Sequence, residues 1–173
     1  FVARTAENNG VSAYVKRSGI ANVYTLNLNH ESGEEYDILQ SYITKNNIDF
    51  VGLGGLSGEY SDIFRVVSYV RKIDPNVIIQ VGGGIMTADP MVTMQAMPDV
   101  DFGIIGEGEQ TSVELIDAIA RKIDVTSVNG IIYRDEIGLR MTNRSVEVAD
   151  LATLALPVFG GCIYVEYLFL IRD

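Results

Sequence analysis

The chain has 173 residues, of which 47% are hydrophobic and 21% are charged, a balance typical of a globular domain with its own core. Its formal net charge of −10 disfavours nucleic acid and anionic membranes as partners, because both are bound by clusters of Lys and Arg. A single cysteine excludes an internal disulfide framework, and there is neither a signal-peptide pattern nor an apolar run of the roughly 18 residues that span a bilayer, so we expect a cytoplasmic protein.

The first half of the chain alternates between strand and helix patterns. Residues 1–3 resemble the last residues of a strand, and "VSAYVKRSG" predicts a short helix that Gly19 closes. Alternation with period two predicts a half-exposed strand over residues 22–29, and apolar residues at helical spacing predict a helix over residues 34–47. "IDFVGLGG" then predicts a buried strand that ends in glycines at Gly55.

The second half of the chain continues this alternation. A helix is predicted over residues 61–74 with Ser61 as its N-cap, and "NVIIQVGGG" predicts the next buried strand. Asp89 and Pro90 are expected at the N-cap and at the first position of the following helix. "VDFGIIG" and "QTSVELIDAIARK" then predict a strand and a helix, and "NGIIYRD" and "GLRMTNR" predict a β-hairpin around residues 135–138.

The order of these elements predicts the fold. Three of the strands are short, continuous apolar runs, which is typical of a parallel sheet covered by helices on both faces. We therefore expect an α/β protein with a flavodoxin-like, doubly wound, five-stranded parallel sheet in the order 2-1-3-4-5, followed by a C-terminal β-hairpin. The domain would comprise residues 1–145, and residues 146–173 would form a linker or tail.

Glycine is concentrated directly after the predicted strands. "GLGGLSGEY", "GGGIMTADP" and "GEGEQT" follow three successive strands, and α/β sheets bind their ligands at the carboxyl ends of the strands. One such loop by itself often serves only as a tight turn. Three of them at one edge of a sheet predict a bulky ligand that lies against the backbone.

Several ligand classes found with this fold do not match the sequence. Gly54 and Gly55 stand where a receiver domain has its phosphoacceptor Asp, and "RTAENNG" offers only Thr5 where a flavodoxin has a hydroxyl-rich phosphate loop. The glycines also lack the place and spacing of a nicotinamide-binding G-x-G-x-x-G. "VGGGI" resembles the phosphate-binding strand of (β/α)8 barrels, so a phosphate ligand at residues 82–84 stays an open alternative.

Over roughly residues 1–157, and most sharply from Asp49 to Leu156, the order and spacing of the motifs resemble the cobalamin-binding domain at the N-terminus of class B radical SAM enzymes. The most specific pieces are Gly82-Gly83 after the fourth strand, "GEGE" after the fifth, and the "GIIYRD" hairpin that leads to "LP". The resemblance implies a corrinoid-binding module of a radical SAM-type, methyltransferase-like protein, in which the nucleotide tail of cobalamin passes between the strand ends. A bulky side chain at Gly82 or Gly83 is then expected to abolish binding and leave the fold largely intact.

The resemblance also implies which residues bind the cofactor. The wider B12-binding family carries D-x-H-x-x-G in its first loop, with the histidine on cobalt, whereas this chain has Thr5 and Glu7 at the Asp and His positions and keeps only Gly10. Because His30 follows a different strand, the resemblance implies base-off cobalamin without a protein histidine ligand; no catalytic or metal-ligating residue is expected. The expected cofactor-binding residues are Thr5, Glu7, Asn8, Gly10, Gly54, Gly55, Leu56, Ser57, Tyr60, Gly82, Gly83, Gly84, Ile85, Met86, Gly106, Glu107, Gly108 and Glu109.

The last segment bears on the radical SAM chemistry. "GGCIYVEYLFL" begins like the C-x-x-x-C-x-x-C motif of that family, but Glu166 and Phe169 stand where the second and third cysteines would fall. We therefore expect S-adenosylmethionine and the [4Fe–4S] cluster to belong to a separate radical SAM domain. The expected partners of this chain are that domain and the corrinoid. Besides the phosphate ligand, a second alternative stays open, a ligand-free interaction domain that associates through residues 163–171.

Overall fold

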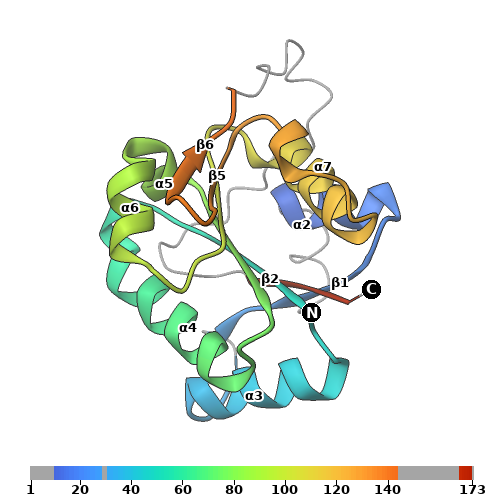
Figure 1. The fold of residues 1–173 in the computed structure, drawn as a ribbon. Coiled ribbons are helices and arrows are strands. Elements are labelled where there is room, and N and C mark those ends of the chain that lie inside the picture. The colour runs from blue at the N-terminus through green and yellow to red at the C-terminus, as the bar shows by residue number, and fades with distance from the viewer. Residues whose placement is uncertain (1–9, 29–30, 144–167, 173) are drawn as a thin grey trace.

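A computed structural model describes residues 10–28, 31–143 and 168–172, and its centre is a seven-stranded sheet with helices on both faces (Figure 1). The strands are β1 (Asn22–Leu26), β2 (Phe50–Gly54), β3 (Ile78–Gly82), β4 (Phe102–Ile104), β5 (Ile131–Arg134), β6 (Leu139–Met141) and β7 (Leu168–Arg172). The helices are α2 (Gly10–Ser18), α3 (Glu35–Asn46), α4 (Tyr60–Ile73), α5 (Gly84–Ala88), α6 (Pro90–Ala96) and α7 (Gly108–Ala120), with short 3-10 turns η2 (Ser57–Glu59) and η3 (Val125–Ser127). None of these described helices is long and apolar enough to cross a membrane.

Local sequence signals account for the ends of two predicted helices. The Asp89 carboxylate accepts a hydrogen bond from the backbone N–H of Val92 at 3.1 Å, and Pro90 occupies the first position of α6, as predicted. Gly19 follows α2 with φ of 70°, the left-handed conformation that a glycine adopts without strain. The capping predictions for α2 and α6 are therefore confirmed.

The start of α4 differs from the prediction. The sequence predicts Ser61 as the N-cap, but the helix begins at Tyr60, and Glu59 at the N-cap position makes no side-chain capping bond. The reason is the turn η2, which runs directly into α4. Within that turn the Glu59 carboxylate accepts a hydrogen bond from the backbone N–H of Leu56, so it is directed back across the loop rather than into the helix.

The order of the strands across the sheet is β1-β7-β2-β3-β4-β5-β6. β2 and β3 pair in parallel, as do β3 and β4, and β5 and β6 form the predicted antiparallel hairpin. The α/β, flavodoxin-like fold is confirmed, but the described sheet is mixed rather than wholly parallel, because β7 runs antiparallel to β1 and β2, and β5 runs antiparallel to β4. The predicted first strand, residues 1–3, lies outside the described residues, so the full order 2-1-3-4-5 stays a prediction.

β7 corrects the prediction of a linker or tail over residues 146–173. Residues 168–172 form a strand that lies between β1 and β2, where the order 2-1-3-4-5 would place strand one. The slot between two strands offers unpaired backbone groups on both sides, and an apolar, extended segment satisfies them. Ile171 is 3% exposed and packs with Val15 and Ile116, which come from α2 and α7. The rest of the predicted tail, residues 146–167, lies outside the described part of the chain.

The side chains of the strands alternate between two cores, one on each face of the sheet. Val51, Leu53, Ile79 and Val81 face the layer of α3, α4, α5 and α6 and belong to the larger core. Phe50 faces the layer of α2 and α7 and belongs to a second core. This alternation decides which residues of β2 and β3 face α2 and α7, and that face holds the candidate site.

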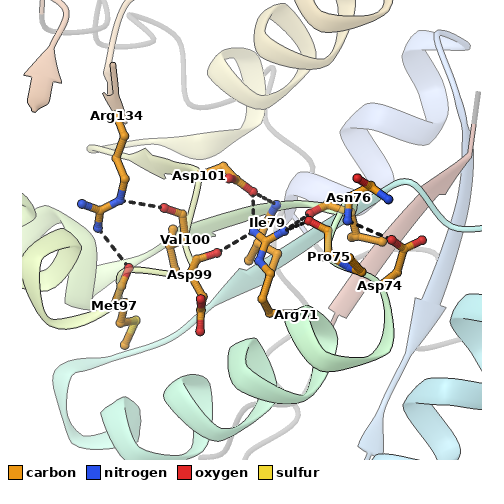
Figure 2. A network of polar contacts seen from close by, with 11 residues as sticks. Arg71, Asp74, Pro75, Asn76, Ile79, Met97, Asp99, Val100, Asp101 and Arg134 are labelled. Carbon is orange, nitrogen blue, oxygen red and sulfur yellow. Dashed lines mark hydrogen bonds and ion pairs between the residues drawn. The ribbon is translucent and has the colours of Figure 1, made fainter. Parts of the chain in front are cut away.

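Arg71 ties the amino ends of β3 and β4 together (Figure 2). Its guanidinium lies 2.8 Å from a carboxylate oxygen of Asp101, which also accepts a hydrogen bond from the backbone N–H of Ile79. The same guanidinium donates to the backbone carbonyl oxygens of Pro75, Val77 and Asp99. The Arg71 guanidinium thus donates hydrogen bonds to backbone carbonyl groups just before the starts of both β3 and β4.

Arg134 of β5 holds the carboxyl end of α6 (Figure 2). Its guanidinium donates to the backbone carbonyl oxygens of Met94 and Met97 and to that of Val100. The last carbonyl groups of a helix lack partners within the helix and carry partial negative charge, so a cation is favourable there. This contact attaches the hairpin to the α5–α6 segment that follows β3.

Asp135 fixes the turn of the β5–β6 hairpin. Its carboxylate accepts hydrogen bonds from the backbone N–H groups of Ile137 and Gly138 at 2.8 and 2.9 Å. These bonds, first that from Ile137, and the nearby Arg140 hold the pKa of the Asp135 carboxyl below its usual value. The turn is therefore built for the ionised side chain.

We expect Ile171→Ala to lower the free energy of unfolding by about 2 to 4 kcal/mol, because it opens a cavity among buried apolar side chains. Urea denaturation followed by circular dichroism measures the change. The matched control is Ile137→Ala, since Ile137 is 83% exposed, and it should cost less than about 0.5 kcal/mol. Equal effects of the two substitutions would show that β7 does not lie in the sheet.

We expect Arg71→Met to lower the free energy of unfolding by about 2 kcal/mol, because it leaves carbonyl groups without their donor and removes the cation beside the Asp101 carboxylate. The control is Arg121→Met, which removes a surface ion pair to Asp117 from a side chain that is 68% exposed. Such pairs contribute roughly 0.5 kcal/mol or less. The same denaturation experiment compares the two, and an Arg71 variant no weaker than the control contradicts this role.

Candidate functional site

A cavity of about 530 Å³ lies at the carboxyl ends of β2, β3 and β4, between the sheet and the N-terminal turns of α2 and α7. Figure 1 shows α2 and α7 together on one face of the sheet. The three glycine-rich loops predicted from the sequence all contribute to it. The predicted residues that line it are Gly10, Gly54, Gly55, Gly82, Gly83, Gly106, Glu107, Gly108 and Glu109.

Missing side chains create this cavity. Gly54 of β2 lies opposite Gly82 of β3 in the parallel register, and both occupy positions that face the α2–α7 layer. A Cβ added to Gly82 would lie 3.5 Å from the Cβ of Ile104, an ordinary contact distance. The strand would therefore accept a small side chain at Gly82, and the side chain would take up space that the cavity now holds.

Gly83 is required by the fold itself. Its φ of 82° is strained for any other residue, and an added Cβ would lie 2.8 Å from the backbone oxygen of Gly55. The expectation that a bulky side chain at Gly83 leaves the fold intact is therefore wrong, because the clash is with backbone. At Gly84 an added Cβ would come too close only to the end of the Leu56 side chain, which can move, and its backbone neighbours lie at ordinary contact distance. The special turn residue is thus Gly83 and not Gly84.

Hydrogen bonds join the three loops around the cavity. The backbone N–H of Ile85 donates to the carbonyl oxygen of Gly55 at 3.0 Å, which links the loops after β3 and β2. The backbone N–H of Gly106 donates to the hydroxyl oxygen of Thr87 at 3.0 Å, which links the loop after β4 to α5. The rim of the cavity is therefore held in place before any ligand arrives.

The N-terminal turns of α2 and α7 close the other side of the cavity. A Cβ added to Gly108 would lie 3.1 Å from a methyl carbon of Val11, and one added to Gly10 would lie 3.5 Å from the carboxylate of Glu109. Gly10 also has a φ of 32°. Glycine at both positions allows the two helices to begin close together, directly above the strand ends.

The charged groups of the cavity are acidic. Glu59, Glu107 and Glu109 line it, and the lining residues in the described part of the chain include no Lys or Arg. Carboxylates accept hydrogen bonds and repel other anions. This arrangement disfavours the alternative of a free phosphate at residues 82–84 and favours a ligand that presents N–H or O–H donors.

A polar pair lies on the sheet side of the cavity. Gln80 is 2% exposed and its side-chain nitrogen donates to the hydroxyl oxygen of Ser112, which is fully buried, at 3.1 Å. The side-chain oxygen Oε1 of Gln80 has no hydrogen-bond partner within the described part of the chain. A buried polar atom without a partner is unfavourable, and such atoms are rare outside sites that bind water or a ligand.

Other predicted site residues lie elsewhere. Leu56, Ser57, Tyr60 and Gly84 are exposed and do not line the cavity. Ile85 and Met86 are buried in the larger core, where the Met86 sulfur occupies the space beside Gly103, and they do not line the cavity. Thr5, Glu7, Asn8 and His30 lie outside the described residues. Among the described residues, no group of His, Cys, Asp and Glu is arranged to hold a metal ion.

The structure adds lining residues that the sequence did not predict. They are Val11, Ser12, Leu53, Glu59, Gln80, Ile104 and Ser112. Most are ordinary helix or strand residues that only the packing of α2 and α7 onto the sheet brings together. Gln80 alone carries a signal in the sequence, since it is the single polar residue within the buried run "VIIQV".

The relatives of this chain agree with the resemblance noted in its motifs. It is 31% identical to the uncharacterized methyltransferase PH0819 of Pyrococcus horikoshii over 93 residues, and this stretch is 54% of this chain and 20% of that protein. It is 30% identical to the anaerobic magnesium-protoporphyrin IX monomethyl ester cyclase of Synechocystis over 101 residues, and this stretch is 58% of this chain and 20% of that protein. The chain thus spans about 20% of the length of these curated relatives.

Solved structures share the fold. The radical S-adenosylmethionine methyltransferase TsrM of Kitasatospora setae, with cobalamin and a [4Fe-4S] cluster bound, superposes with a TM-score of 0.57 at 19% identity, over 64% of this chain and 21% of TsrM. The cobalamin-dependent radical enzyme OxsB, with aqua-cobalamin and S-adenosylmethionine bound, superposes with a TM-score of 0.55 at 24% identity, over 66% of this chain and 16% of OxsB. The model of the B12 binding domain family matches residues 2–116, which is more than half of the chain, and the protein is therefore a member of the B12-binding domain family.

Proposed function

We propose that this domain binds a corrinoid, cobalamin or a close relative, as the cofactor module of a radical SAM-type, methyltransferase-like protein. The observation that carries the proposal is the cavity of about 530 Å³ at the carboxyl ends of β2, β3 and β4, which exists because glycines replace side chains there. Membership of the B12-binding family supports the cofactor class. The radical SAM context is supported by the relatives, TsrM and OxsB among them.

The residues of the cavity fit the parts of a corrinoid. A corrinoid combines a broad macrocycle, edged with amide groups, and a narrower nucleotide tail that ends in an aromatic base. The tail contains a phosphodiester, which carries less negative charge than free phosphate and is therefore repelled less by the carboxylates of the cavity. A cavity of about 530 Å³ accommodates a small ligand but not the macrocycle and tail together, so the tail would enter it and the macrocycle would cover the loops. Gly54 and Gly82 would leave space for the tail, and Glu107 and Glu109 would accept hydrogen bonds from the amides.

The cobalt would have no histidine ligand from this chain. The only histidine of the sequence, His30, follows the edge strand β1, whereas the family motif places its histidine in the loop that leads into α2. We therefore propose that the corrinoid is bound base-off, with its nucleotide directed away from the cobalt. In that state the aromatic base is free to be bound by the protein.

When bound, cobalamin supplies a cobalt centre that can carry a methyl group. The contribution of this chain is to bind and orient the corrinoid and to shield its lower face from water. The donor of the methyl group, S-adenosylmethionine, and the [4Fe–4S] cluster would be held by a radical SAM domain that faces the exposed side of the macrocycle. The proposed reaction is methyl transfer by the whole protein, to which this domain supplies the cofactor.

We expect the purified domain to retain hydroxocobalamin after mixing and desalting, with the visible absorbance of a corrin. After reduction to the Co(II) state, the electron paramagnetic resonance spectrum should lack the splitting that an axial nitrogen ligand produces. Inorganic phosphate should not displace the corrinoid, because the cavity is acidic. A protein that elutes without corrin absorbance contradicts the cofactor proposal, and nitrogen splitting contradicts base-off binding without histidine.

We expect Gly82→Val to weaken corrinoid binding by roughly 10- to 100-fold or more, because the side chain would fill the space required by the tail. Its circular dichroism should be unchanged, since the added Cβ meets Ile104 only at contact distance. Gly58→Val is the matched control, as nothing lies within 4 Å of an added Cβ there. If both variants bind hydroxocobalamin as the wild type does, the tail does not enter this cavity.

A further inference from the structure

The position of Gln80 places a polar group inside the cavity rather than at its rim. Gln80 and Gly82 lie two residues apart in β3, so their side chains point to the same face of the sheet, toward α7. Gly82 ends the strand at the edge where the loops begin, and Gln80 lies one step deeper along the strand. Both residues line the cavity, so a ligand that passes Gly82 lies beside the Gln80 side chain.

The orientation of this amide is set by one hydrogen bond. The side-chain nitrogen of Gln80 donates to the hydroxyl oxygen of Ser112 at 3.1 Å. The other end of the amide, Oε1, is buried and has no partner within the described residues. A carbonyl oxygen accepts hydrogen bonds and cannot donate them. Gln80 lines the cavity and thus brings to it a buried acceptor that has no donor among the described residues.

We infer that Gln80 selects the lower base of the corrinoid and favours a base with an N–H donor, such as adenine, over 5,6-dimethylbenzimidazole. This inference rests on the proposed function. The amino group of adenine can donate to Oε1 of Gln80. Dimethylbenzimidazole offers methyl groups and, in the base-off state, a ring nitrogen that accepts, so it would leave Oε1 buried without a donor.

The rest of the cavity suits a planar aromatic base of either kind. Ile104 and Val11 provide apolar walls, and the glycines provide open backbone surface. These groups bind aromatic rings without distinguishing their polar edges. Discrimination between two bases of similar size therefore falls to Gln80, whose orientation depends on Ser112.

The test compares the dissociation constants of adenylcobamide and cobalamin for the wild type and for Gln80→Met, a side chain of similar length without the amide. The ratio of the two constants is compared between proteins, so that the different ease of freeing each base from cobalt cancels. We expect the wild type to prefer adenylcobamide, and we expect the substitution to reduce the preference by about tenfold. The control is Gln110→Met, at an exposed glutamine of α7 outside the cavity, which should leave the ratio unchanged.

The outcomes separate this inference from the function on which it rests. If both cobamides bind and the ratio is the same in the wild type and Gln80→Met, or if the substitution selectively weakens cobalamin, the inference is wrong and corrinoid binding stands. If neither cobamide binds the wild type, the proposed function itself fails. Should Gln80→Met not fold, Ser112→Ala removes the bond that orients the amide and is expected to lower the same ratio. A purely structural role for Gln80 would change stability but not the ratio.

Discussion

The register of β2 against β3 is the constraint on which the site depends. Gly54 lies opposite Gly82, and both face the layer of α2 and α7. A slip of one residue would bring Leu53 or Val81 to this face, and their side chains would fill the cavity. The register is secure because Leu53 and Val81 are completely or almost completely buried in the core on the opposite face. The packing of one face of the sheet therefore maintains an open space on the other.

The polarity of the cavity is matched to a ligand rich in hydrogen-bond donors. Carboxylates of Glu107 and Glu109 stand at the rim beside glycine backbone, and Gln80 lies within. All three present acceptors, and none presents a positive charge. Acceptors at the rim suit the amides that edge a corrin macrocycle, and an acceptor within suits the edge of a base. The acidic character seen in the net charge of −10 thus extends into the site.

The frame around the cavity is held by contacts that are distant in sequence. Arg71 joins the starts of β3 and β4, and Arg134 attaches the hairpin to α6 (Figure 2). β7 occupies the slot between β1 and β2, where its Ile171 joins the core beneath α2 and α7. These contacts lie away from the loops at the carboxyl ends, which are joined to one another by their own hydrogen bonds. A scaffold divided in this way allows the binding loops to be rich in glycine without loss of the fold.

The sequence by itself determined most of the elements, the α/β class and the edge of the sheet that carries the site, because apolar periodicity, Asp89 and Gly19 act over a few residues. It also pointed to Gly82, since a glycine after a buried strand is a local signal. Only the tertiary structure decided the place of β7, the turn role of Gly83 and the part played by Gln80. Each of these depends on a neighbour distant along the chain: two strands with an open slot, the backbone of Gly55, and a serine of α7. Local sequence patterns depend only on nearby residues, so these three features could be found only from the packing of the tertiary structure.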